Sequence, residues 1–296
     1  MSSDNELDKY IAEHLKKCYP ARDDNGRRLF YHYTTVDTLE VLTRRKADMM
    51  CTYCGALNDR SEFVVGIELI KKYMKHHPKE QEIVPCDVLD QIASDPSCAA
   101  WSMSFSLERD SLSQWTSYTD RTEGGVAIGF DMDRLNEKIH ACKKCGLMYL
   151  VPCLYVGADD SEIDGLLRFL FGSYRRTVSL ALAAKHKVPE LDVWRGVTAT
   201  LALIFAAMVK EGSFRDEHEW RLVMQTFVPE IVRDCEFVGG KPRLRTGLFG
   251  DHFRLAQDIV DIICSPHGHL QSRVKMISAL RQLSIKPQQS ASSYNG

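Results

Sequence analysis

The sequence predicts an α+β protein. Segments with strand-like alternation and segments with helix-like spacing intermix along the chain without a regular strand–helix repeat, which argues against a doubly wound sheet. The chain has 296 residues, enough to bury a substantial core. Its 44% hydrophobic and 26% charged residues are an ordinary balance for a globular protein.

The first half of the chain begins with a predicted amphipathic helix, in which Leu7, Ile11 and Leu15 recur at steps of four. An apolar strand over 29–33 follows, and Thr35 is placed to cap the next helix at 36–45. Gly124 and Gly125 precede a continuous apolar run typical of a covered strand. The same patterns predict further strands at 47–53, 98–106 and 126–130, and helices at 61–76 and 111–118.

The second half carries most of the predicted helical mass. A strand over 148–156 precedes two Leu- and Ala-rich helices at 163–185 and 191–210. Later patterns predict strands at 220–227, 235–238 and 259–264 and a helix at 271–283. We therefore expect an N-terminal helical extension over 1–26 and a single domain over 27–284 with a helical insertion at about 160–212. The Ser-, Gln- and Pro-containing tail over 285–296 is predicted to be disordered.

Charge and hydropathy exclude several whole-chain functions. The 38 basic and 40 acidic residues give a net charge of −2, which argues against a generally cationic nucleic-acid coat. The longest weakly polar run, 196–209, is shorter than the roughly 20 residues that a membrane span requires. The first residues are polar and acidic, unlike a secretion signal. We expect a cytoplasmic protein with no membrane partner.

The ten cysteines raise the question of a metal site. Cys51/Cys54 and Cys142/Cys145 have metal-ligand spacing, but nearly ninety residues separate the pairs. We favour small, semi-buried cysteines and assign no metal ligand, with a zinc site as the alternative.

Three segments place polar side chains in strand-like surroundings, and glycine fingerprints and hydrolase motifs are absent from the sequence. In the first, LFYHYTT, alternation puts His32 and Thr34 on one face and Tyr31 and Tyr33 on the other. His32 is either a core histidine bonded to a backbone carbonyl or a cleft residue.

The second segment, WSMSFSLERDSLSQWTSY, places Ser102, Ser104 and Ser106 on one strand face. Their hydroxyls suit either a ligand or solvent. Trp115 and Tyr118, three residues apart on the next helix, more often pack than stack on a ligand.

The third segment, FRDEHEWRL, projects Glu217 and Glu219 from one face at a strand start. Repulsion between them would raise the pKa of one carboxyl and suit a site that stabilises positive charge or accepts a proton. Alternatively, both are solvated, with Arg215 and Arg221 as weak ion-pair partners.

Several blocks of the sequence resemble the bacterial family known as domain of unknown function 2971, whose name carries no chemistry. These blocks run from Leu29 to about Cys264 and comprise YHYTT, LNDRSEF, SFS with QWTSY, GGVAIGFD and EHEWRL.

The order of His32, a Ser-x-Ser and a Glu-x-Glu also resembles the ADP-ribosyltransferase superfamily. This resemblance implies a split, mostly antiparallel sheet of ADP-ribosyltransferase type, with helices packed around it and NAD bound as substrate in the cleft. It implies that His32 and Thr34 hold the adenosine ribose. One hydroxyl of Ser104-Phe105-Ser106 would lie near the nicotinamide ribose.

The same resemblance implies two catalytic residues. Glu219 would bind the nicotinamide ribose hydroxyl, and Glu217 would position or deprotonate the acceptor. Tyr118 or Tyr53 would provide a stacking ring for the cofactor. Breaking the bond to nicotinamide builds positive charge on the ribose carbon, which a fixed carboxylate stabilises.

We therefore expect an NAD-dependent ADP-ribosyltransferase that modifies a macromolecule, as a toxin or anti-phage effector, with an antitoxin or defence protein as its partner. Basic groups at 44–46, 175–176 and 241–245 leave both nucleic acid and protein open as acceptor. One alternative is a non-catalytic module that senses a nucleotide or a protein in phage defence. The other is a metal-dependent nuclease that uses Glu217, His218 and Glu219.

Overall fold

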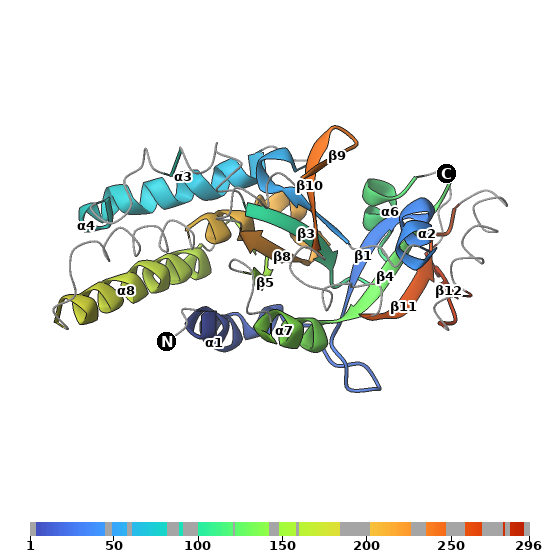
Figure 1. Cartoon of the computed structure of the whole chain (residues 1–296), viewed down its shortest axis with the longest axis horizontal. Coiled ribbons are helices and arrows are strands. Elements are labelled where there is room, and N and C mark those ends of the chain that lie inside the picture. Colours follow the sequence, from blue (N-terminus) through green and yellow to red (C-terminus); the bar gives the residue numbers. More distant parts are fainter. Residues whose placement is uncertain are drawn as a thin grey trace.

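The chain forms a mixed α+β structure around a mostly antiparallel sheet (Figure 1). The computed structural model describes residues 4–44, 49–57, 61–81, 89–90, 100–120, 122–141, 148–157, 160–183, 202–225, 235–246, 258–267, 281 and 285–292. The strands of the large sheet are β1 (Leu29–Thr35), β2 (Met50–Tyr53), β3 (Ala100–Ser106), β4 (Gly125–Asp131), β5 (Met148–Pro152), β8 (Glu219–Gln225), β9 (Glu236–Val238), β10 (Lys241–Arg245), β11 (Ile259–Cys264) and β12 (Gln288–Gln289). Their order is β12-β11-β4-β1-β3-β2-β10-β9, and β8 pairs with both β3 and β5.

The sheet opens beside β3. One edge of β3 pairs with β8 along its whole length, from Ala100 to Ser106. The other edge pairs with β2 at Trp101 and Ser102 and with β1 at Ser106 alone. Between these contacts the Ser104 carbonyl accepts a hydrogen bond from a side chain, His32 Nδ1, at 2.8 Å. The strands β1 and β2 therefore diverge and leave a gap along the middle of β3.

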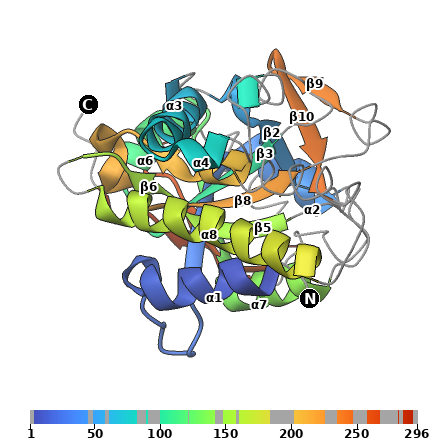
Figure 2. The ribbon, with the colours of Figure 1, turned by 90° about the vertical axis from the view of Figure 1, so that its left-hand side faces the viewer.

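Helices cover both faces of the sheet. On one face, α3 (Ser61–His76), α8 (Ser161–Ala183) and a helical segment at 202–208 pack over Val223 of β8 (Figure 2). On the other, α2 (Val36–Arg44) and α7 (Met132–Ala141) pack in a core with Leu222 and Met224. Because successive side chains of β8 point to opposite faces of the sheet, the strand contributes to both cores.

The remaining elements attach to this framework. They are α1 (Asp4–His14), η1 (Lys16–Cys18), η2 (Cys54–Ala56), α4 (Pro78–Gln81), α6 (Leu112–Tyr118), η4 (Gly212–Glu217) and the parallel pair β6 (Leu154–Tyr155) and β7 (Val209–Lys210). Ile11 and Leu15 are buried in the first core, so the predicted amphipathic helix docks on the body. None of the helices in the described ranges is long and apolar enough to cross a membrane.

Some sequence expectations differ from the structure. The helix α7 and the strand β10 were not predicted. The sequence predicts a disordered tail over 285–296. In the structure, Gln288–Gln289 instead pair in parallel with β11, and Asp110 Oδ2 accepts a hydrogen bond from the Ala291 amide. The expected helices at 191–210 and 271–283 fall mainly outside the described residues.

Candidate functional site

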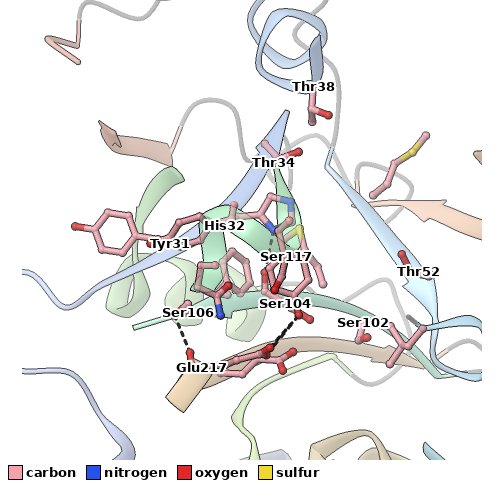
Figure 3. Close-up of a pocket in the computed structure, with 18 of the residues that line it drawn as sticks. Tyr31, His32, Thr34, Thr38, Thr52, Ser102, Ser104, Ser106, Ser117 and Glu217 are labelled. Carbon is pink, nitrogen blue, oxygen red and sulfur yellow. Dashed lines mark hydrogen bonds between the residues drawn. The ribbon is translucent and has the colours of Figure 1, made fainter. Parts of the chain in front are cut away.

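A cavity of about 370 Å³ lies at the gap in the sheet (Figure 3). Its lining is mainly polar and comes largely from β1, α2, β2, β3, α6, η4, β8 and β10. All of the predicted catalytic and cofactor-binding residues line it, namely His32, Thr34, Ser104, Ser106, Tyr118, Glu217 and Glu219. The fold thus brings residues almost two hundred positions apart in the sequence to one place.

His32 both completes the sheet and lines the cavity. Because a carbonyl only accepts, the Nδ1 bonded to Ser104 carries the hydrogen of a neutral ring. Burial lowers the pKa of His32; the hydrogen bond to Ser104 opposes this change and the charge of Arg243 adds to it. The ring is therefore neutral at pH 7, and its Nε2 is an acceptor. His32 therefore bonds a backbone carbonyl and lines the cavity at the same time, so the two alternatives drawn from the sequence are compatible.

The Ser106 hydroxyl is hydrogen-bonded to backbone groups and is therefore not available to a ligand. Its Oγ donates to the Glu217 carbonyl at 2.7 Å and accepts from the Glu108 amide at 3.0 Å. These bonds tie the end of β3 to the junction between η4 and β8. Ser106 therefore positions Glu217.

The two glutamates reach one spot by a different route from the predicted strand alternation. Glu217 ends η4, His218 adopts a left-handed conformation with φ of 43°, and Glu219 begins β8. Both carboxylates meet the ammonium of Lys210, whose Nζ lies 2.5 Å from Glu217 Oε2 and 2.6 Å from Glu219 Oε2. A buried cation thus bridges the pair.

Glu219 is an ionised group in a buried ion network. Arg221 Nε donates to Glu219 Oε1 at 2.7 Å, and the guanidinium also donates to the Ala207 carbonyl. Burial alone would raise the pKa of Glu219, but the charges and hydrogen bonds of Arg221 and Lys210 outweigh it and lower the pKa to about 2. The expectation that repulsion between the carboxylates raises the pKa is wrong for Glu219, because the nearby cations Lys210 and Arg221 lower it instead.

The charges are arranged with the acids toward the cavity. Glu217 and Glu219 line it, whereas Lys210 and Arg221 are not among its lining residues. The Glu217 side chain is 15% exposed and that of Glu219 is 4% exposed. Tyr118 OH donates to Glu217 Oε1 at 3.3 Å. Glu217 is therefore the more accessible carboxylate, and Tyr118 contacts it from α6.

A second cavity of about 420 Å³ also reaches Glu219. Glu219 is the one residue of the predicted set that lines it, and its other lining residues include Cys18, Cys153, Leu154 and Trp220. Because all of the predicted site residues line the cavity at the sheet gap, we take that cavity as the candidate site.

Residues 114–222 match the family described as "Protein of unknown function (DUF2971)". No curated protein and no solved structure matches the chain. The DUF2971 segment holds Tyr118, Lys210, Glu217 and Glu219, so it supplies the carboxylate end of the cavity. His32 and the serines of β3 precede it in the chain.

Sequence reasoning missed Lys210 and Arg243 as site residues. One signal in the sequence could have indicated Lys210: it directly follows the apolar run 202–209 and lies shortly before Glu217 and Glu219. Arg243 was placed only in a basic group.

The cysteines give no separate centre in the described ranges. Cys51 and Cys54 are buried, and Cys51 Sγ contacts Met224 Sδ at 3.8 Å. Burial raises the pKa of Cys51. Cys142 and Cys145 lie outside the described residues. Within the described part of the chain, no group of three or more His, Cys, Asp or Glu side chains is arranged to hold a metal ion.

Proposed function

We propose that this protein is an NAD-dependent ADP-ribosyltransferase with a macromolecular acceptor. The observation that carries the proposal is the convergence of His32, the β3 serines and the Glu-x-Glu carboxylates on one cavity at an opening of the sheet. The cavity volume, about 370 Å³, lies in the range of small-molecule sites, about 300–1,000 Å³.

In this proposal NAD spans the cavity from β1 to η4. The Nε2 of neutral His32 accepts a hydrogen bond from a hydroxyl of the adenosine ribose, and Thr34 adds a further hydroxyl contact. The nicotinamide ribose lies by Ser104, with its reacting carbon toward Glu217. Tyr118 packs beside this end of the ligand.

The transfer step breaks the bond between the ribose carbon and the nicotinamide nitrogen. The electron pair leaves with nicotinamide, which becomes neutral, and positive charge develops on the ribose carbon. Glu217 stabilises that charge and takes the proton that the acceptor loses when its nucleophilic atom bonds to the carbon. Glu219, fixed by Arg221 and Lys210, accepts from the ribose hydroxyl through a remaining lone pair.

A non-catalytic NAD or nucleotide sensor is the second candidate, and a specific observation favours it. Lys210 and Arg221 place two positive charges against the two carboxylates, which reduces the stabilisation available to a developing cation. A nuclease has less support: in the described structure an ammonium lies where a metal ion would bridge Glu217 and Glu219.

The test is nicotinamide release from NAD, measured by liquid chromatography with cell extract as the acceptor source. We expect Glu217→Gln to lose at least about a hundredfold in rate, the size of effect found when one electrostatic stabiliser is removed. Glu13→Gln, an exposed substitution on α1, is the control and should match wild type. Circular dichroism checks the fold of both variants.

Glu217 is preferred to Glu219 for this test because Glu219 belongs to the buried ion network, so its replacement also affects folding. Wild-type rates in Glu217→Gln would overturn the proposed role of Glu217. NAD binding by calorimetry without any nicotinamide release would replace the enzyme with the sensor.

A further inference from the structure

The end of the cavity away from the glutamates holds two buried polar atoms without a partner. Ser102 Oγ, on a residue that is 2% exposed, and Arg243 Nε have no hydrogen-bond partner in the described structure. Both residues line the cavity. Buried donors are nearly always satisfied in folded proteins, and leaving one unsatisfied costs free energy. Ser102 and Arg243 thus each bring an unsatisfied polar atom to the wall of one cavity, as expected where a ligand supplies the partner.

Sheet register places these groups in one row. Ser102 of β3 is opposite Thr52 of β2, and Thr52 is opposite Arg243 of β10. Residues opposite one another on neighbouring strands project from the same face. Lys241, two positions before Arg243, also lines the cavity. This end therefore combines two hydroxyls with two cationic side chains.

The cavity is thus polarised along β3. Ser102 lies at the basic end, and Ser106 lies at the carboxylate end, opposite Glu219 (Figure 3). Ser106 is four positions after Ser102 on the strand, a distance of about 13 Å at about 3.3 Å per residue. An anion is repelled from the glutamates and attracted to Arg243. The charge of Arg243 also contributes to lowering the pKa of His32, after burial, which is consistent with their facing the same space.

We infer that Ser102, Thr52 and Arg243 form a subsite for a phosphoryl group of the bound ligand. A phosphoryl group offers several acceptor oxygens, and a guanidinium with adjacent hydroxyls supplies the matching donors. The identity of this ligand as NAD rests on the proposed function. The subsite itself requires only a phosphorylated ligand in the cavity.

The experiment compares ADP with adenosine by isothermal titration calorimetry on the full chain. Wild type should bind ADP at least about tenfold more tightly than adenosine, because a charge-assisted contact to phosphate is among the stronger hydrogen bonds. Arg243→Gln should remove this preference and leave adenosine binding unchanged. Ser102→Ala, a minimal change in volume, should reduce the preference by a smaller factor.

Arg245→Gln is the matched control. Arg245 lies on the same strand, but its Nε pairs with Glu236 at 2.5 Å and it is not among the cavity-lining residues. It should keep the wild-type preference. An equal ADP preference in wild type and Arg243→Gln would overturn the subsite, as would a wild type that binds both ligands equally.

A second arm distinguishes the source of the phosphate. If the subsite takes the diphosphate of a dinucleotide, pyrophosphate should compete with NAD, and Arg243→Gln should weaken NAD binding. If it takes a phosphate of the acceptor, pyrophosphate should not compete with NAD, and Arg243→Gln should weaken the binding of ADP and of a 5′-phosphorylated tetranucleotide while leaving NAD binding unchanged; that pattern supports the subsite with the acceptor as its source.

The outcome can be separated from that of the proposed function. Loss of the phosphate preference in Arg243→Gln, with no nicotinamide release by wild type, would keep the subsite and reject the transferase. Normal nicotinamide release by wild type, with a phosphate preference that Arg243→Gln leaves unchanged, would keep the transferase and reject the subsite.

Discussion

Replacing Glu219 with Gln should destabilise the protein through the buried ion network. The change removes the carboxylate charge that Lys210 and Arg221 share and leaves both cations underneutralised in the core. The pKa of Glu219 is lowered from its ordinary 4.5 to about 2, and a difference of that size corresponds to about 3 kcal/mol of folding free energy. Breaking one partner of a buried ion pair costs a similar amount, about 3–5 kcal/mol.

The effect should depend on pH with a defined sign. Because the folded-state pKa of Glu219 lies below its unfolded value, the stabilisation is complete above pH 4.5 and is lost as the pH falls toward 2. The difference between wild type and Glu219→Gln should therefore be largest near pH 7 and shrink through this window.

Urea unfolding followed by circular dichroism at pH 7 and at about pH 3.5 measures this difference. Glu13→Gln, on the exposed side of α1, serves as the control and should unfold like wild type at both pH values. A Glu219→Gln variant as stable as wild type at pH 7 would refute the ion network as the cause of the low pKa.

Three further predictions concern the scaffold around the site. Gly66→Ala should destabilise the protein by about 1–3 kcal/mol in urea unfolding, because the new Cβ would lie 2.5 Å from Ala206 Cα, whereas Gly172→Ala has open space and should stabilise α8 by up to about 1 kcal/mol. Asp110→Ala should speed proteolysis of the C-terminal tail, followed by mass spectrometry, because Asp110 bonds the Ser290 hydroxyl and the Ala291 amide. Lys210→Met should move acid unfolding to higher pH, since Glu219 loses one of its two cations.

Each of these predictions has a contrary outcome. Equal effects of the two glycine substitutions would show that α3 does not pack tightly on the 202–208 helix. Unchanged tail cleavage in Asp110→Ala would show that β12 alone holds the tail. Acid unfolding of Lys210→Met at the wild-type pH would leave Arg221 as the sole cause of the low pKa of Glu219.

The elements that periodicity predicted are those with a strong local pattern. The strand at 126–130 is continuously apolar, and the structure covers it on both faces as β4. The helix α7 was missed although Met132, Leu135 and Ile139 stand at helical steps. The predicted strand stops at residue 130, and the next residue begins the helix, because Asp131 Oδ1 accepts a hydrogen bond from the Asp133 amide.

The sequence indicated residues that line one cavity, but not the charged groups that contact them. Alternation and motif order indicated His32, the β3 serines and the two glutamates, and these line one cavity. Lys210 meets the glutamates only because β7 and η4 are brought together in space, and no local pattern contains that contact. Likewise, Arg243 reaches the cavity through the register of β10 on β2.

The tail shows why composition alone fails for a short edge strand. Its Ser and Gln content cannot build a core, but β12 is held by backbone pairing to β11 and by Asp110, neither of which needs apolar side chains.

Mass spectrometry of acceptors after incubation of the protein with isotope-labelled NAD and cell extract tests the transferase most directly. We predict a macromolecule that carries labelled ADP-ribose with wild type and Glu13→Gln, and that is lost with Glu217→Gln. Labelled NAD recovered intact, with no modified macromolecule, would contradict the proposed reaction.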